Sequence, residues 1–266
     1  MRHKPDLPAV LDVEVTTHGQ LSDGVGYARR KIAALGRFAH QPVLHAHVKL
    51  SQHGDPAVAR RIIAQANLDV NGRLVRAQVE GRTVREAIDR LEARLRHQLE
   101  RVAEHWEVRR GRTPSGQPQE WRHQSEPAHR PSYFPRPPEQ RQIIRHKSFT
   151  LGTLSIDEAA EEMELLDYDF HLFTERGTQQ ASVLYRSGPT GYRLAQVKPS
   201  PQELAPHELP VTVSSQPPPR VTVQEATERL SLLGLPFLFF IDAAEGRAGV
   251  LYHRYDGHYG LISPAG

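Results

Sequence analysis

Hydrophobic and polar residues alternate in four short stretches of the first third of the chain, which is the pattern of strands with one buried face. Asn71-Gly72 separates the last two stretches and predicts a tight hairpin, because both residues tolerate positive φ. The pattern therefore predicts a four-stranded sheet. Its buried positions are expected to be Leu11, Val13, Val15, Leu44, Ala46, Val48, Leu50, Ile62, Ala64, Ala66, Leu68, Val70, Val75, Ala77 and Val79.

Two stretches have the longer period of amphipathic helices. Ser22 is expected to cap the first helix, whose apolar stripe is Val25, Ala28, Ile32, Leu35 and Ala39. Thr83 and Glu86 form a capping box at the start of a second helix, expected from Thr83 to Trp106. Residues 1–107 are therefore predicted to form a β-α-β-β-β-α domain, with both helices on one face of the sheet.

The periodicity disappears in residues 108–142, which are rich in proline, arginine and small polar residues. Such a segment cannot compensate for its ordering entropy by burial. We therefore predict a flexible linker, and its basic residues are candidates to extend a nucleic-acid contact.

An internal repeat follows the linker. A shift of 67 residues superimposes Val183-Leu184-Tyr185 on Val250-Leu251-Tyr252, and many single positions match in the same register. The first copy is expected at 143–197, a connector at 198–208 and the second copy at 209–266. Each copy is predicted to begin with a strand, 143–149 or 209–215, and to continue with a capping box, a helix and two or three further strands.

Each copy is too small to bury its own sheet, so pairing of the two copies is the natural solution. The run 235–241 is apolar on both strand faces, which fits a strand buried between two layers. The sequence therefore predicts an α+β protein whose tandem β-α-β-β(-β) modules form an intramolecular pseudo-dimer. The expected inter-repeat interface consists of Phe170, Phe173, Tyr185, Phe237, Phe239, Tyr252 and Tyr259.

Charge is distributed unevenly. Residues 1–112 hold 20 Lys and Arg against 13 Asp and Glu, whereas residues 143–266 hold 10 against 15. The first domain is therefore the part expected to meet a polyanion. Its candidate RNA-binding residues are Arg30, Lys31, Arg37, Arg82, Arg85, Arg90, Arg94, His97, Arg101, Arg109 and Arg110. An ordinary solvated helix face explains the same charges, because acidic residues are interspersed among them.

No pattern typical of catalysis is present. The chain has no cysteine, and its 15 histidines include one close pair, His45 and His47, without a third ligand at metal-site spacing. Phosphate loops, nucleophile elbows and paired-carboxylate motifs are not found. We expect no enzyme activity, metal or cofactor, and in the absence of a long apolar run we expect a cytoplasmic protein without a membrane partner.

Several groups of residues resemble the long-form ribosome hibernation promoting factors, and the tandem C-terminal modules are most similar to the hypoxia-induced, dormancy-associated factors of actinobacteria. In the first domain the resemblance is carried by Tyr27, Lys31-Ile32, Leu35, Phe38, Ala87-Ile88-Asp89, Leu95 and Gln98-Leu99. In the modules it is carried by Glu158-Ala159, Leu165-Leu166, Asp169-Phe170, Tyr252 and Gly260-Leu261-Ile262.

The resemblance implies a function. Family members bind the small ribosomal subunit over the decoding centre, exclude mRNA and the A- and P-site tRNAs, and keep ribosomes idle. The family's basic positions fall on Lys31, Arg94, His97 and Arg101, and the expected partners are 16S rRNA and ribosomal proteins. A single C-terminal domain pairs ribosomes in long-form relatives. Self-pairing in cis predicts idle monomeric 70S ribosomes here. The alternatives are a ribosome-dimerising scaffold and a non-ribosomal RNA-binding or transcription regulator.

Overall fold

The computed structural model describes residues 11–19, 21–53, 59–109, 136–187 and 191–265, with the side chains of 103–109 excepted. The chain divides into two compact units, and we describe each by itself. One is an N-terminal domain to which residues 164–167 also belong, and the other is a C-terminal unit that holds the rest of both repeats. In the described part of the chain, no helix has the length and apolar character needed to cross a membrane.

The N-terminal domain contains a four-stranded sheet in the order β1-β2-β3-β4. Its strands are β1 (Val13–His18), β2 (Val43–Gln52), β3 (Ile62–Val70) and β4 (Arg73–Gly81). β1 runs parallel to β2, and the other neighbours are antiparallel. The predicted hairpin between β3 and β4 is confirmed, because Asn71 and Gly72 both have positive φ, 52° and 85°.

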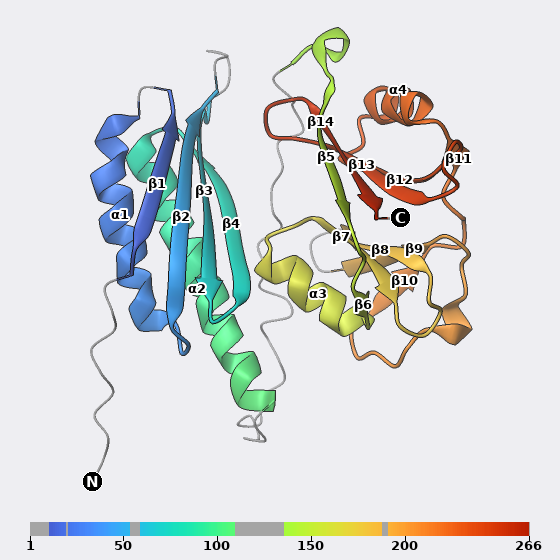
Figure 1. The fold of residues 1–266 in the computed structure, drawn as a ribbon, viewed down its shortest axis with the longest axis horizontal. Coiled ribbons are helices and arrows are strands. Elements are labelled where there is room, and N and C mark those ends of the chain that lie inside the picture. The colour runs from blue at the N-terminus through green and yellow to red at the C-terminus, as the bar shows by residue number, and fades with distance from the viewer. Residues whose placement is uncertain (1–10, 20, 54–58, 110–135, 188–190, 266) are drawn as a thin grey trace. The chain divides into compact units, whose positions relative to one another are not determined.

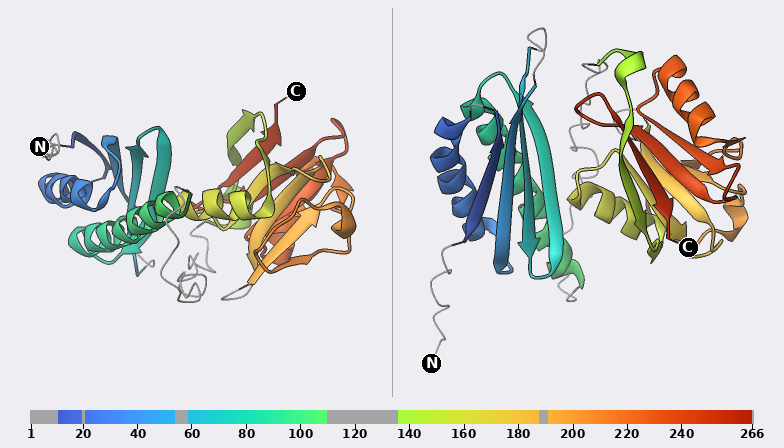
Figure 2. Two further views of the ribbon diagram at one scale, coloured as in Figure 1. Left: turned by 90° about the horizontal axis from the view of Figure 1, so that it is seen from below. Right: turned by 45° about the horizontal axis from the view of Figure 1, so that its top comes forward.

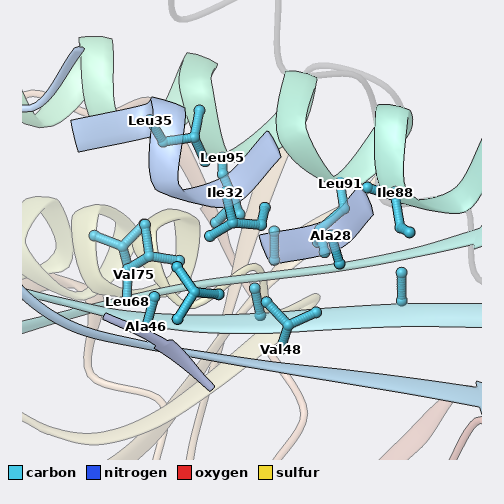
Figure 3. Close-up of a cluster of buried hydrophobic side chains, with 14 of the residues drawn as sticks. Ala28, Ile32, Leu35, Ala46, Val48, Leu68, Val75, Ile88, Leu91 and Leu95 are labelled. Atoms are coloured by element: carbon cyan, nitrogen blue, oxygen red, sulfur yellow. The ribbon is translucent and has the colours of Figure 1, made fainter. Parts of the chain in front are cut away.

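Two helices cover one face of this sheet, as predicted (Figures 1 and 2). α1 (Val25–Ala33) is flanked by the 3₁₀ turns η1 (Ser22–Gly24) and η2 (Ala34–Phe38), and α2 spans Val84–Arg109. Figure 3 shows how the helical stripes meet the buried faces of the strands in one core. Its labelled side chains are Ala28, Ile32, Leu35, Ala46, Val48, Leu68, Val75, Ile88, Leu91 and Leu95.

Two local predictions for this domain are wrong. Leu44 is 59% exposed, because β2 contains an irregularity between Val43 and His45 that shifts the strand register. Ser22 does not cap α1, because the chain enters the helix through η1 and the Ser22 hydroxyl hydrogen-bonds Asp23 instead.

The start of α2 packs closely against η1. Thr83 Oγ1 accepts a hydrogen bond from Glu86 N at 3.2 Å, whereas the Glu86 carboxylate reaches back to Arg82 N, one residue further than in an ordinary capping box. A Cβ on Gly24 would lie only 2.3 Å from Val84 Cγ1. The absence of a side chain at Gly24 therefore permits the close approach of η1 to α2.

The C-terminal unit consists of two repeats of a helix and short strands. The first contains β5 (Ile143–Phe149), β6 (Thr153–Leu154), α3 (Ile156–Leu165), β7 (Phe170–Glu175), β8 (Ala181–Ser187) and β9 (Gly191–Gln196), preceded by η4 (Pro138–Gln140). The second contains β10 (Val211–Val213), β11 (Arg220–Val221), α4 (Val223–Leu233), β12 (Phe237–Asp242), β13 (Ala248–His253) and β14 (Tyr259–Pro264), preceded by η5 (Pro201–Glu203). Both predicted capping boxes are formed, at Ser155 and at Thr222.

The first strand of each repeat belongs to the sheet of the other repeat. One sheet has the order β10-β9-β8-β7-β6 and the other β11-β12-β13-β14-β5. The exchange is symmetric in register: β14 Leu261 pairs with β5 His146, and the positions 67 residues away, Leu194 and Val213, pair in the same way. The two modules are therefore joined by reciprocal strand exchange as well as by packing.

The two sheets pack against each other through a shared apolar cluster. The Phe170 and Phe237 ring centroids lie 4.7 Å apart, and these residues occupy equivalent positions of the two repeats. The Phe170–Tyr252 contact at 5.7 Å and the Tyr185–Phe237 contact at 5.3 Å are likewise exchanged by the repeat. The aromatic contacts between the two sheets are therefore self-complementary, as in an interface with two-fold symmetry.

One buried carboxylate, Glu175, helps to hold the connector between the repeats in place. Its oxygens accept hydrogen bonds from Gly177 N, Thr178 N, Thr178 Oγ1 and, in the connector, Ala205 N at 3.0 Å. Burial alone would raise the pKa of Glu175, but the hydrogen bonds from backbone N–H groups outweigh it and lower that pKa. Gly177 allows the connector to pass, because a Cβ there would lie 2.2 Å from Glu203 O.

Candidate nucleic-acid interface

α2 presents two charged edges that face different neighbours. Arg85, Asp89, Glu92 and Arg96 follow the i, i+4, i+7, i+11 spacing and lie on the edge beside α1, which we call the seam edge. Arg90, Arg94, His97 and Arg101 follow the same spacing on the opposite edge, which we call the outer edge. Arg90 Nη1 donates to Glu80 O of β4 at 3.0 Å, so the outer edge begins over β4.

Near the start of α2, the seam edge holds a network of charges that balance one another. Tyr27 donates a hydrogen bond to Asp89 Oδ1 at 2.6 Å, and Lys31 Nζ lies 2.9 Å from the same oxygen. The hydrogen bond from Tyr27 and the ammonium group of Lys31 lower the pKa of Asp89, and Asp89 in turn raises the pKa of Tyr27 and of Lys31. Arg85 lies over the Tyr27 ring at 5.5 Å. Lys31 is therefore held in place with its charge largely compensated.

Three arginines of the outer edge form ion pairs: Arg90 with Glu86, Arg94 with Asp167 and Arg101 with Glu164. Arg90 Nη2 lies 2.7 Å from Glu86 Oε1, an i, i+4 ion pair that is partly open to solvent. The pKa of Glu86 is lowered, first by the hydrogen bond from Arg82 N and also by the charge of Arg90. Exposed pairs of this kind contribute only about 0.2–1 kcal/mol, so Arg90 can exchange its partner for a phosphate at small cost.

A second aromatic residue, Phe38 at the end of η2, contacts two arginines at the far end of the seam edge. Arg37 Cζ lies 4.7 Å from the centroid of the Phe38 ring, and Arg96 Cζ lies 4.4 Å from it. Arg96 Nε also donates to Glu100 Oε1 at 3.0 Å, and both side chains of that ion pair are about half exposed. This end of the seam carries more positive than negative charge.

The structure places seven of the eleven predicted basic residues in two groups. Lys31, Arg37 and Arg85 border the seam, whereas Arg90, Arg94, His97 and Arg101 follow the outer edge. Arg30 and Arg82 are exposed. Arg109 ends α2 with its side chain outside the described residues, and Arg110 lies outside them altogether.

Sequence reasoning missed Arg96 and Phe38 as possible site residues. The available signal was the i, i+11 spacing of Arg96 from Arg85, which places it on the edge that faces the first helix.

Of the seven aromatic residues predicted to join the repeats, five lie in the cluster between the sheets: Phe170, Tyr185, Phe237, Phe239 and Tyr252. Phe173 and Tyr259 lie elsewhere, and for these two the prediction is wrong. Each sits on the opposite face of its strand, in the core between one sheet and its own helix. The period of two in a strand explains the difference, because Phe173 is an odd number of residues from Phe170.

Comparison with known families gives matches over most of the chain. Residues 21–106 match the family described as sigma 54 modulation protein / S30EA ribosomal protein, and residues 138–194 and 211–261 each match its C-terminal domain, sigma 54 modulation/S30EA ribosomal protein C terminus. The chain belongs to the S30EA ribosomal protein family. The two separate C-terminal matches also agree with the duplication read from the sequence.

Named relatives match parts of the chain. The "Dormancy associated translation inhibitor" of Mycobacterium tuberculosis is 41% identical over 136 residues, which cover 48% of this chain and 50% of that protein. The "Ribosome hibernation promotion factor" of Picosynechococcus is 34% identical over 55 residues, 21% of this chain and 28% of that protein. The chain thus spans about half the length, or less, of the curated relatives it matches.

Among solved structures, the N-terminal domain of Thermus thermophilus Protein Y is 27% identical. The match covers 35% of this chain and 99% of that one, with a TM-score of 0.30.

Proposed function

We propose that this protein is a ribosome hibernation factor of the cytoplasm. Its N-terminal domain binds the small ribosomal subunit at the decoding centre, through 16S rRNA and neighbouring ribosomal proteins. Bound there, it blocks mRNA and the A- and P-site tRNAs, inhibits translation and preserves idle ribosomes. The protein acts by occupying a site, without catalysis.

The observation that carries this proposal is the basic surface of the two helices, α1 with η2 and α2, in a domain that belongs to the S30EA family. Arg90 on the outer edge and Arg37 and Arg96 at the Phe38 end of the seam edge are exposed. The ion-pair partners of Arg90 and Arg96 are Glu86 and Glu100, and both carboxylates are partly open to solvent. Guanidinium groups bind phosphate oxygens two at a time, so a folded RNA offers the ligand that this surface fits. The names of the relatives, a translation inhibitor and a hibernation factor, support the same function.

The strand exchange supports monomeric 70S particles as the product. β5 covers the edge of β14, β10 covers the edge of β9, and the apolar faces of the sheets lie against each other. A second chain that paired through the same surfaces would first have to displace these contacts. We therefore propose that the modules satisfy each other in cis and do not join two ribosomes.

Sedimentation of purified 70S ribosomes with the full chain tests the proposal. We expect the protein in the 70S and small-subunit peaks, with no heavier ribosome peak and with translation inhibited. Replacing Arg90, Arg94 and Arg101 with Glu should abolish both binding and inhibition. The matched control replaces Arg193, Arg229 and Arg247, exposed arginines of the C-terminal unit, in the same way and should leave both intact.

Each alternative predicts a different outcome of the same experiment. A ribosome-dimer peak would indicate the scaffold function, with pairing in trans. Absence of the protein from every ribosomal peak would contradict ribosome binding and favour a regulator that acts on other RNA or on transcription. Inhibition by the triple charge-reversal variant equal to that of the unchanged protein would contradict the outer edge as part of the site.

A further inference from the structure

Phe38 holds two arginines of different elements against one ring. Arg37 belongs to η2 and Arg96 to α2, and both guanidinium carbons lie within 5 Å of the ring centroid. Phe38 itself is only half-buried, and both arginines are exposed. The cluster is thus a surface feature that joins the two helical elements.

The electrostatics of the seam differ between its two ends. At the Tyr27 end, Lys31 lies within 4 Å of both Asp89 and Glu92, so positive and negative charges are matched. At the Phe38 end, Glu100 is the acidic partner of Arg96, and within the described part of the chain Arg37 forms no ion pair. Two like charges that share one ring repel each other, and an anion placed between them would relieve the repulsion.

We propose that Arg37 and Arg96 form a phosphate-binding subsite for the RNA backbone, with Phe38 as the positioning residue that holds their guanidinium planes. This subsite deepens the proposed function and rests on it. It lies on the seam edge and is separate from the outer edge of Arg90, Arg94 and Arg101, so the RNA contacts both edges of α2.

The ring explains how flexible side chains become a defined site. A free arginine loses rotamer entropy when it binds a phosphate, whereas an arginine already stacked on an aromatic face has lost part of that freedom. The stacked guanidinium retains the N–H groups at its rim, and these can hold two phosphate oxygens at once. The ion pair with Glu100 is exposed and therefore weak enough to be replaced by a phosphate.

Binding of the full chain to purified small ribosomal subunits, measured across a salt series, tests the subsite. Arg37→Gln and Arg96→Gln should each reduce the slope of log affinity against log salt by about one, because each removes one phosphate contact. Phe38→Leu should weaken binding by about twofold to fivefold per released arginine while leaving the charge unchanged. Phe38→Tyr keeps an aromatic face and should restore the affinity of the unchanged chain.

Controls separate this subsite from the rest of the account. Arg193→Gln, at an exposed position of β9, should leave the salt slope unchanged, and amide hydrogen exchange of α1 and α2 should show that each variant is folded. Normal binding of the unchanged chain, with unaltered slopes for Arg37→Gln and Arg96→Gln, would overturn the subsite alone. Affinity of Phe38→Leu equal to that of Phe38→Tyr would overturn the role of the ring. Failure of the unchanged chain to bind would overturn the proposed function and the subsite together.

Discussion

Replacing Phe170 with alanine should destabilise both C-terminal modules together. Phe170 is 6% exposed, and its ring contacts Phe237 and Tyr252 of the other repeat. Truncation of a buried phenylalanine costs about 3–5 kcal/mol, the sum of lost transfer free energy and the cavity left behind. The aromatic pair Phe170 and Phe237 should account for about 0.5–1.5 kcal/mol of this as a coupling energy in a double-mutant cycle.

Amide hydrogen exchange of the full chain in a urea series gives the unfolding free energy for each strand separately. We expect Phe170→Ala to lower it for β7 and equally for β12, because each sheet contains a strand of the other repeat. Leu233→Ala is the control, since Leu233 is 62% exposed at the end of α4 and should change stability by less than about 0.5 kcal/mol. A loss below about 1 kcal/mol, or a loss in β7 without one in β12, would refute the shared interface.

Two further predictions concern acid stability and close packing. The pKa of Glu175 is lowered in the folded state. The ionised carboxylate therefore contributes fully to the free energy of unfolding above its unfolded pKa of about 4.3, and this contribution is lost as pH falls through the lower folded value. Glu175→Gln should therefore destabilise the C-terminal unit at neutral pH and weaken the fall of its stability in acid. Thermal denaturation at about pH 3 to 7 measures both effects. A stability profile against pH equal to that of the unchanged chain would contradict this role of Glu175. Gly24→Ala should destabilise the N-terminal domain by about 1–3 kcal/mol, because the new Cβ meets Val84 and Leu50, and hydrogen exchange in α2 would detect it. Wild-type protection in α2 would show that this approach is not tight.

Local patterns in the sequence predicted most elements of the fold but could not predict their partners. The period of two identified the four strands of the first domain, and the 67-residue repeat identified both modules. The sequence does not show which sheet the first strand of each repeat joins. The same alternation of apolar and polar residues allows that strand to pair within its own repeat or with the other repeat. The exposure of Leu44 was not predicted for a related reason, because the hydrophobic pattern gives no sign of the register shift in β2.

The candidate site was predicted only in part for a similar reason. Helical spacing shows that Arg90, Arg94 and Arg101 share an edge, but it does not show which neighbour that edge faces. The rotation of α2 about its own axis decides this, and the packing of Ile88, Leu91 and Leu95 into the core fixes that rotation. Arg96 reaches Phe38 as a result.

The central claim, that one chain binds the ribosome while its modules complete each other, is tested most directly with a cross-link across the exchanged strand. Ser148 of β5 pairs with Ser263 of β14, and neighbouring strands lie about 4.8 Å apart, within reach of a disulfide. The chain has no cysteine, so Ser148→Cys with Ser263→Cys introduces a single possible bond. Oxidation of this variant, followed by a denaturing gel and by sedimentation with 70S ribosomes, examines pairing and binding in the same sample.

We predict a cross-linked monomer that sediments with 70S ribosomes and produces no heavier ribosome peak. A mixture of the two single-cysteine chains should then give no covalent β5–β14 dimer beyond the level of each chain alone. Covalent dimers in the mixture, a ribosome-dimer peak with the cross-linked monomer, or a cross-linked monomer that leaves ribosomes unbound would contradict the account.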